Sequence, residues 1–165
     1  MEQEITIRRL NSKDLDEFYP LFEKMISHDI PEIASKADFF LKSDYSKGRI
    51  HSSLVFPKIA IFGAFVKDER SGSEKLVGFI WGNSTYAGLG FISWLKVAGE
   101  YKRNGIGGRL IGYYEDFVRS KGGHVVELYC FQGMKEYYRK QGYEVIGIRE
   151  KGYFKLKQFI LNKYL

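Results

Sequence analysis

The sequence predicts an α/β protein in which a mixed sheet carries helices on its faces. Segments that alternate apolar and polar residues, as strands do, are interspersed with segments whose apolar residues recur every three or four positions, as in amphipathic helices. Hydrophobic residues make up 44% of the 165 residues and charged residues 28%, which is an ordinary globular composition. No internal repeat or linker-like tract interrupts the chain. Residues 1–165 are therefore expected to form a single domain.

The first half of the chain is expected to form a strand, two helices and a hairpin. Ile5 and Ile7 alternate with polar neighbours, which predicts the first strand. Asn11 and Ser12 offer N-cap side chains for the first helix, and Pro31 begins the second. These patterns predict strands at 4–10, 58–67 and 76–82, helices at 12–26 and 31–41, a turn at 68–75, and no regular structure at 43–57.

The second half alternates strands with two helices. Ile106, Leu110, Tyr114 and Phe117 share one face of a helix that Gly122 and Gly123 end. The segment HVVELYCF is nearly all apolar and is typical of a buried strand. The expected strands are 90–98, 124–131, 144–150 and 154–164, and the expected helices are 107–121 and 134–141.

Composition excludes several classes of protein. The 26 Lys and Arg residues against 20 Asp and Glu give a net charge of +6, which points to an anionic ligand without naming one. Cys130 is the only cysteine and His28, His51 and His124 lie far apart, so we expect no disulfide and no metal site. The start of the chain lacks the pattern of a signal peptide, and the longest apolar run, Ile59–Val66, is far too short to span a bilayer. A cytoplasmic protein without membrane contact is expected.

A glycine-rich turn carries the chemical content of the sequence. The segment GEYKRNGIGGRL, residues 99–110, lies between a predicted strand and a predicted helix. Its glycines permit a sharp turn, and the backbone N–H groups at the start of the helix form an anion site. Lys102, Arg103 and Arg109 add three positive charges. The segment predicts a seat for a phosphate or pyrophosphate, although it matches neither the P-loop nor the GxGxxG pattern.

Two segments resemble motifs of the GNAT superfamily of N-acetyltransferases. Val97–Gly107 is similar to the loop written [QR]-x-x-G-x-[GA], with Lys102 at the Gln/Arg position and Gly105 and Gly107 at the two glycines. Glu136–Tyr143 resembles the family segment L-Y-x-K-x-G-F. The resemblance covers nearly the whole chain. It implies a mostly antiparallel central sheet with one splayed parallel strand pair.

The resemblance also implies where acetyl-CoA, as acyl donor, would bind. The pantetheine arm would lie along the strand at 94–97, against the backbone of Leu95, Lys96 and Val97. The pyrophosphate would sit on the following loop, whose expected binding residues are Lys102, Arg103, Asn104, Gly105, Ile106, Gly107 and Gly108. Lys102 keeps the positive charge of the usual residue but not the planar fork of an arginine.

Catalytic residues can be carried over only in part. Tyr138 falls on the family's tyrosine, which would donate a proton as the coenzyme thiolate leaves. Many relatives place a carboxylate on the strand before the loop to take the amine proton, yet residues 88–98 contain no Asp, Glu or His. Glu127, His124 or an ordered water are the candidates for this base. Cys130 is expected to be a small buried hydrophobe rather than a nucleophile.

The expected activity is acetyl transfer to a primary amine, of a small molecule or a protein N-terminus, by direct attack in a ternary complex. A relative that binds acyl-CoA as a sensor without turnover, and a basic nucleic-acid-binding domain, are the alternatives. His28, Asp29 and Glu32 lie where this family usually admits the acceptor, and equally suit a solvated helix end. The basic tail at 151–165 is explained by strand patterning, and a homodimer formed through that strand is left open.

Overall fold

The computed structural model describes residues 4–67 and 71–165. Within these ranges seven strands form one sheet in the order β1-β2-β3-β4-β5-β7-β6. All neighbouring strands are antiparallel except β4 and β5. This confirms the predicted mixed α/β fold with one parallel pair. The strands are β1 (Ile5–Arg9), β2 (Ile59–Lys67), β3 (Glu74–Tyr86), β4 (Leu89–Val97), β5 (Val125–Cys130), β6 (Glu144–Arg149) and β7 (Gln158–Tyr164).

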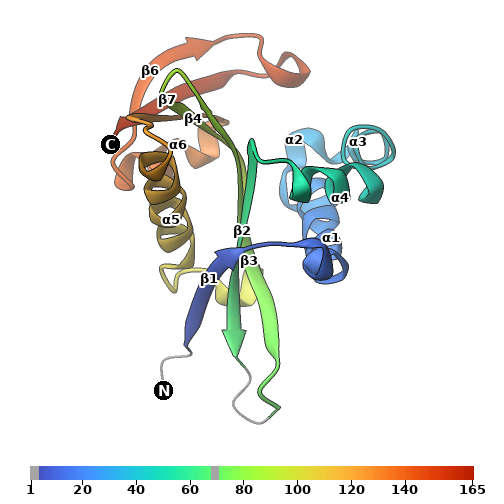
Figure 1. The fold of residues 1–165 in the computed structure, drawn as a ribbon. Coiled ribbons are helices and arrows are strands. Elements are labelled where there is room, and N and C mark those ends of the chain that lie inside the picture. Colours follow the sequence, from blue (N-terminus) through green and yellow to red (C-terminus); the bar gives the residue numbers. More distant parts are fainter. Residues whose placement is uncertain (1–3, 68–70) are drawn as a thin grey trace.

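The leading helices cover one face of the sheet (Figure 1). They are η1 (Ser12–Asp14), α1 (Leu15–Lys24), the π-helical turn η2 (Met25–Asp29), α2 (Pro31–Ala34), α3 (Ala37–Lys42) and α4 (Lys47–Val55). The first begins as predicted, because the Asn11 side chain accepts from the Lys13 N–H and Asp14 accepts from the Asn11 N–H. The predicted helix at 31–41 is two short helices.

Helix α4 corrects the prediction of no regular structure at 43–57. Ile50 and Leu54, one helical turn apart, are buried against α1 and β2. The helix also contains Gly48, Ser52 and Ser53, whose intrinsic helix preference is low. Both serine hydroxyls donate to carbonyls four residues earlier instead of marking a turn. Tertiary packing therefore outweighs a weak local signal here.

Helix α5 (Ile106–Ser120) and the short helix α6 (Lys135–Lys140) cover the opposite face. Their core is separate from that of the leading helices. Side chains that alternate along the strands divide between the two: Phe62, Ile80, Val126 and Leu128 join α5, whereas Ile61, Phe79 and Trp81 join α1. The sheet is apolar on both faces, and helices on each side bury the two apolar faces.

The remaining differences lie at element boundaries. Strand β3 starts at Glu74, inside the predicted turn, and residues 68–70 of that turn lie outside the described residues. The last predicted strand begins only at Gln158. Before it, η5 (Tyr153–Lys155) turns the chain, with Phe154 and Lys155 both at positive φ. The other short turns are η3 (Gly99–Tyr101) and η4 (Gln132–Met134).

Candidate active site

Strands β4 and β5 separate halfway along their length. Their parallel pairing runs from Leu89 opposite Val125 to Ile92 opposite Leu128 and then stops. Beyond it, residues 94–97 of β4 pair only with β3, and the end of β5 pairs only with β7. In the part of the chain that the structure describes, the β5-facing backbone groups of residues 94–97 have no strand partner. An extended polar ligand can hydrogen-bond to this free edge as a strand would.

A β-bulge at Ser93 re-aims the side chains beside this gap. Ile92 lies opposite Gly82 and Trp94 opposite Trp81, so Ser93 is an extra residue. Ile92 therefore joins the α5 core, whereas Trp94 turns to the leading helices. Leu95 and Val97 again pack toward α5. Sequence reasoning missed this bulge, although the two apolar neighbours Trp94 and Leu95 break the strand alternation.

The loop after β4 ends in an uncapped helix N-terminus. Gly105 is the N-cap of α5 at φ +72°, and no side chain accepts from the first N–H groups of the helix. Those groups are free to bind an anion in this described segment. Lys102, Arg103 and Asn104 are exposed beside them. Arg103 also has a positive φ, of +68°, so the turn bends through two left-handed residues.

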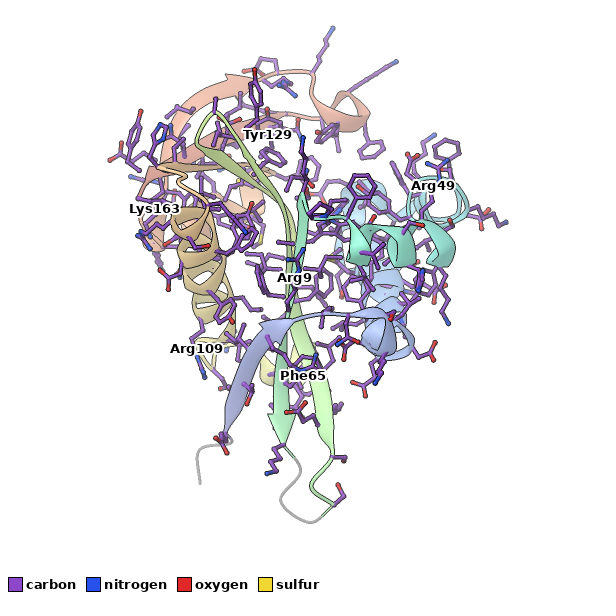
Figure 2. All side chains as sticks on the ribbon, in the orientation of Figure 1. Arg9, Arg49, Phe65, Arg109, Tyr129 and Lys163 are labelled. Carbon is purple, nitrogen blue, oxygen red and sulfur yellow. The ribbon has the colours of Figure 1, made fainter. Side chains whose placement is uncertain are left out.

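The loop charges do not all face the anion site as expected. The Arg109 guanidinium donates to the backbone carbonyl of Ile5 at 2.8 Å, tying α5 to β1 (Figure 2). Lys102 and Arg103 form no ion pair within residues 4–67 and 71–165, so their charges are available. Two of the three predicted cations therefore stay free for a ligand.

Gly107 and Gly108 have a packing role that sequence reasoning did not assign. A Cβ atom at Gly107 would lie 2.3 Å from the Tyr137 hydroxyl oxygen, and one at Gly108 would lie 2.9 Å from Oε1 of Gln141. These two glycines let the start of α5 approach α6. Around Gly105, by contrast, the space is open. The loop thus joins the anion site directly to the helix that carries Tyr138.

Tyr138 lies in the α5-side core, at the open end of β5. Its ring contacts those of Tyr137 and Tyr143, with centroids 5.3 and 6.1 Å away. No described residue hydrogen-bonds to its hydroxyl. Burial, reinforced by Tyr137 and Cys130, raises the pKa of Tyr138 above its ordinary value. The phenol is therefore protonated at neutral pH and has its proton available to donate.

A buried ionic network holds α6 in place. Glu115 of α5 accepts from the Tyr143 hydroxyl at 3.0 Å and from the Lys163 ammonium at 2.9 and 3.0 Å. Lys163 reaches α5 from β7 (Figure 2). The Tyr143 N–H donates to the Tyr138 carbonyl at 3.1 Å. Glu115 thereby fixes the turn that follows Tyr138.

Glu127 lies on the other face of β5 from Tyr138. Val126, Leu128 and Cys130 point into the α5 core, so alternation turns Glu127 and Tyr129 toward the face of the leading helices. Glu127 is half-buried between Phe91 of β4 and Asn162 of β7. It forms no ion pair among the described side chains. The sequence does not show which face of the sheet each side chain of β5 occupies, and the structure does.

His124 and Cys130 are poorly suited to the chemistry. His124 lies beside Gly88, at the end where β4 and β5 are paired. The strands separate after Leu128, which is four residues further along the strand and therefore roughly 13 Å from His124. Burial raises the pKa of the Cys130 thiol to about 11, so it is a neutral thiol near pH 7. Among the described residues no cluster of His, Cys, Asp or Glu could hold a metal ion.

An ion pair that sequence reasoning did not find joins the leading helices to β4. The Lys96 ammonium donates to Asp29 of η2, and their side chains are 7% and 29% exposed. Lys96 points to this face because the Ser93 bulge shifts the alternation. The sequence suits Asp29 equally to an acceptor contact and to a solvated helix end. In the structure this carboxylate is held against β4 by Lys96.

Removing either partner of this pair has unequal consequences. We expect Asp29→Asn to lower the free energy of unfolding by about 2 kcal/mol, because it strands a buried ammonium. Lys96→Met should cost less than about 1 kcal/mol, because the partly exposed Asp29 carboxylate can be hydrated. Urea unfolding of both variants measures the difference. Equal losses would mean that the pair contributes through packing rather than charge.

Comparison with known proteins agrees with this geometry. The sequence model of the acetyltransferase (GNAT) family matches residues 27–143. The chain belongs to the GNAT family. It is therefore an acyltransferase by family, and the resemblance inferred from its two motifs is confirmed. A search of curated proteins gives no match.

Solved structures share the GNAT fold over nearly the full chain. The PaiA N-acetyltransferase from Thermoplasma acidophilum, in complex with coenzyme A, is 23% identical with a TM-score of 0.78, over 98% of this chain and 99% of that one. An aminoglycoside 6'-N-acetyltransferase complexed with coenzyme A is 18% identical with a TM-score of 0.68, over 96% of each chain. The ribosomal-protein-S18-alanine N-acetyltransferase from Escherichia coli is 15% identical with a TM-score of 0.68, over 98% and 94%. None of the described helices is long and apolar enough to cross a membrane.

Proposed function

We propose that this GNAT protein transfers the acetyl group of acetyl-CoA to a primary amine by direct attack in a ternary complex. One observation carries the proposal: the unpaired edge of β4 leads directly to the uncapped N-terminus of α5. The first feature suits the amides of a pantetheine arm, and the second suits a diphosphate. Two of the similar structures contain coenzyme A, which supports this choice of donor.

The coenzyme would be held mainly by backbone groups. Leu95, Lys96 and Val97 offer theirs along the gap, while the Leu95 and Val97 side chains face the α5 core. The amides of Ile106, Gly107 and Gly108 would receive the pyrophosphate. Exposed Lys102 and Arg103 would add charge at the rim without the cost of burying a lone cation.

Tyr138 and Glu127 would act from opposite faces of the sheet. The neutral amine attacks the thioester carbonyl carbon, a C–N bond forms, and the C–S bond breaks as the tetrahedral intermediate collapses. Tyr138, whose hydroxyl has no described partner, would protonate the departing thiolate from the α5 side. Glu127, on the face of the leading helices, would take the amine proton directly or through a water.

The acceptor would enter between the leading helices and β4. Trp94 and the Asp29 carboxylate lie on that side of the gap. The Trp94 ring packs against the rings of Phe22 and Tyr45, with centroids 5.9 and 5.6 Å away, so it would form a wall on this side of the gap. A small amine and a protein N-terminus both remain candidate acceptors.

Calorimetric titration with acetyl-CoA, beside CoA, ATP and a short oligonucleotide, tests the donor site. We expect selective binding of the two CoA compounds. Binding followed by amine-dependent release of CoA establishes the enzyme, whereas binding without release across an amine panel favours an acyl-CoA sensor. Salt-sensitive oligonucleotide binding without CoA binding would refute the proposal in favour of a nucleic-acid-binding domain.

A further inference from the structure

The free edge of β6 is the most exposed part of the sheet. The strand order leaves β6 at one edge and β1 at the other, and β6 runs along the outer rim of the molecule (Figure 1). The tail strand β7, which the sequence leaves open for pairing with another chain, lies between β5 and β6 and has no free edge. Apart from the short gap between β4 and β5, a partner strand therefore has the two outer edges of the described sheet to join.

The two edges differ in chemistry. Strand β1 presents Arg8 and Arg9, and Arg8 is bound to Asp14. Charged residues of this kind normally protect an edge from pairing. Strand β6 instead exposes Val145, Ile146 and Ile148, whose accessible fractions are 39%, 53% and 51%. An edge strand with three exposed β-branched residues is poorly suited to water and well suited to a partner strand.

The charges of β6 lie at its two ends and have opposite signs. Glu144 begins the strand and Arg149 ends it. Neither forms an ion pair within residues 4–67 and 71–165, and the Arg149 guanidinium lies over the Tyr129 ring at 4.9 Å. Read in opposite directions, two copies of EVIGIR place Glu opposite Arg and Val opposite Ile. The strand is complementary to itself, as an isologous contact requires.

The faces of the strand agree with this register. A bulge between Val145 and Gly147 shifts the alternation of β6 against β7. Val145 and Ile148 then lie opposite Leu161 and Phe159, which belong to the α5 core, so both point to that face. Glu144 and Arg149, opposite Asn162 and Gln158, point to the other face. Glu144 and Arg149 therefore share one face, and Val145 and Ile148 share the other. In a regular strand, residues separated by an odd number of positions would lie on opposite faces, and the bulge removes this difference.

We propose that β6 pairs antiparallel with β6 of a second copy, around a two-fold axis between Ile146 and Gly147. Glu144 of each copy then faces Arg149 of the partner subunit, and Val145 faces Ile148 of the partner subunit. The groove beside this contact is lined by Val145, Ile148 and Phe159 together with Lys135 and Arg139 of α6, and Glu144 borders it at the start of the strand. It receives apolar side chains of the second copy. The dimer continues the sheet through both subunits.

Sedimentation equilibrium over a range of chain concentrations tests the dimer. We expect the wild type to dimerise, and Glu144→Arg or Arg149→Glu to weaken dimerisation at least about tenfold, because symmetry makes each reversal act twice. The double variant, with both residues exchanged, should dimerise as the wild type does, since opposite charges again face each other. Glu23→Arg and Lys13→Glu make the same charge changes on exposed residues outside β6 and should have no effect.

Three outcomes overturn the proposal. They are a wild type that is monomeric throughout, a dimer that neither single reversal weakens, and a double variant that is no better than the singles. Circular dichroism of each variant shows whether it is folded, which is expected because Glu144 and Arg149 are exposed. Ile146→Lys provides a second route, since an ammonium next to the axis should abolish dimerisation independently of the end charges. None of these measurements uses catalysis.

Discussion

Tyr138→Phe is expected to lower the rate of acetyl transfer about 100-fold, the lower range for losing a general acid. The affinity for acetyl-CoA should change little, because the ring remains in the core and the hydroxyl has no described partner to lose. Steady-state kinetics with calorimetry separates the two effects. A fall in affinity that matches the fall in rate would instead make Tyr138 a binding residue.

The pH dependence of the rate follows from the same burial. The pKa of Tyr138 is raised above its ordinary value of about 10, so the phenol keeps its proton throughout the neutral and mildly alkaline range. The rate should therefore rise with pH as the acceptor amine loses its proton, without a fall caused by Tyr138 below about pH 10. Tyr138→Phe should keep this rising limb at a lower level.

Tyr113→Phe serves as the control. Tyr113 lies on α5, is 42% exposed and packs its ring on Phe62, and its hydroxyl has no partner in the described structure. Removing that hydroxyl makes the same chemical change away from the gap between β4 and β5. An equal loss of rate in both variants would remove Tyr138 from the proposed role.

The main architecture could be predicted from local patterns. Strand alternation, the periodicity of α5 and the Asn11 cap are properties of short segments, and each lies where the sequence places it. The loop could be located because glycines and an amphipathic helix follow a strand. The resemblance implied one parallel strand pair, but the insertion of β7 between β5 and β6 was not predicted, since no local pattern indicates it.

The parts that could not be predicted depend on long-range contacts. The Ser93 bulge is defined by the register of β4 against β3, and that register decides which way Lys96 points. Asp29 meets Lys96 across 67 residues of sequence. The phase of Glu127 likewise required the strands on both of its sides. The loop was predictable as a backbone feature, whereas the face proposed to admit the acceptor is built from side chains of distant segments.

Gly107→Ala is expected to weaken acetyl-CoA binding at least about tenfold and to destabilise the chain by about 1 to 3 kcal/mol, the usual cost of overpacking. The added Cβ would lie 2.3 Å from the Tyr137 hydroxyl oxygen, and because the Tyr137 ring is packed against Tyr138, we expect the start of α5 to move away from α6. That movement displaces the N–H groups proposed to bind the pyrophosphate. Thermal unfolding and calorimetric titration measure the two effects on the same sample.

The double variant Gly107→Ala, Tyr137→Phe separates helix packing from coenzyme contact. Without the Tyr137 hydroxyl, the nearest ring atom lies 3.4 Å from the new Cβ, which is an ordinary contact. Stability should therefore return to that of Tyr137→Phe alone, the matched control. If binding returns with it, Gly107 acts by letting α5 approach α6. If binding stays weak in a chain of restored stability, the methyl group itself blocks the pyrophosphate. Undiminished binding in Gly107→Ala itself would show that the coenzyme lies elsewhere, because no other described helix N-terminus adjoins the free edge of β4.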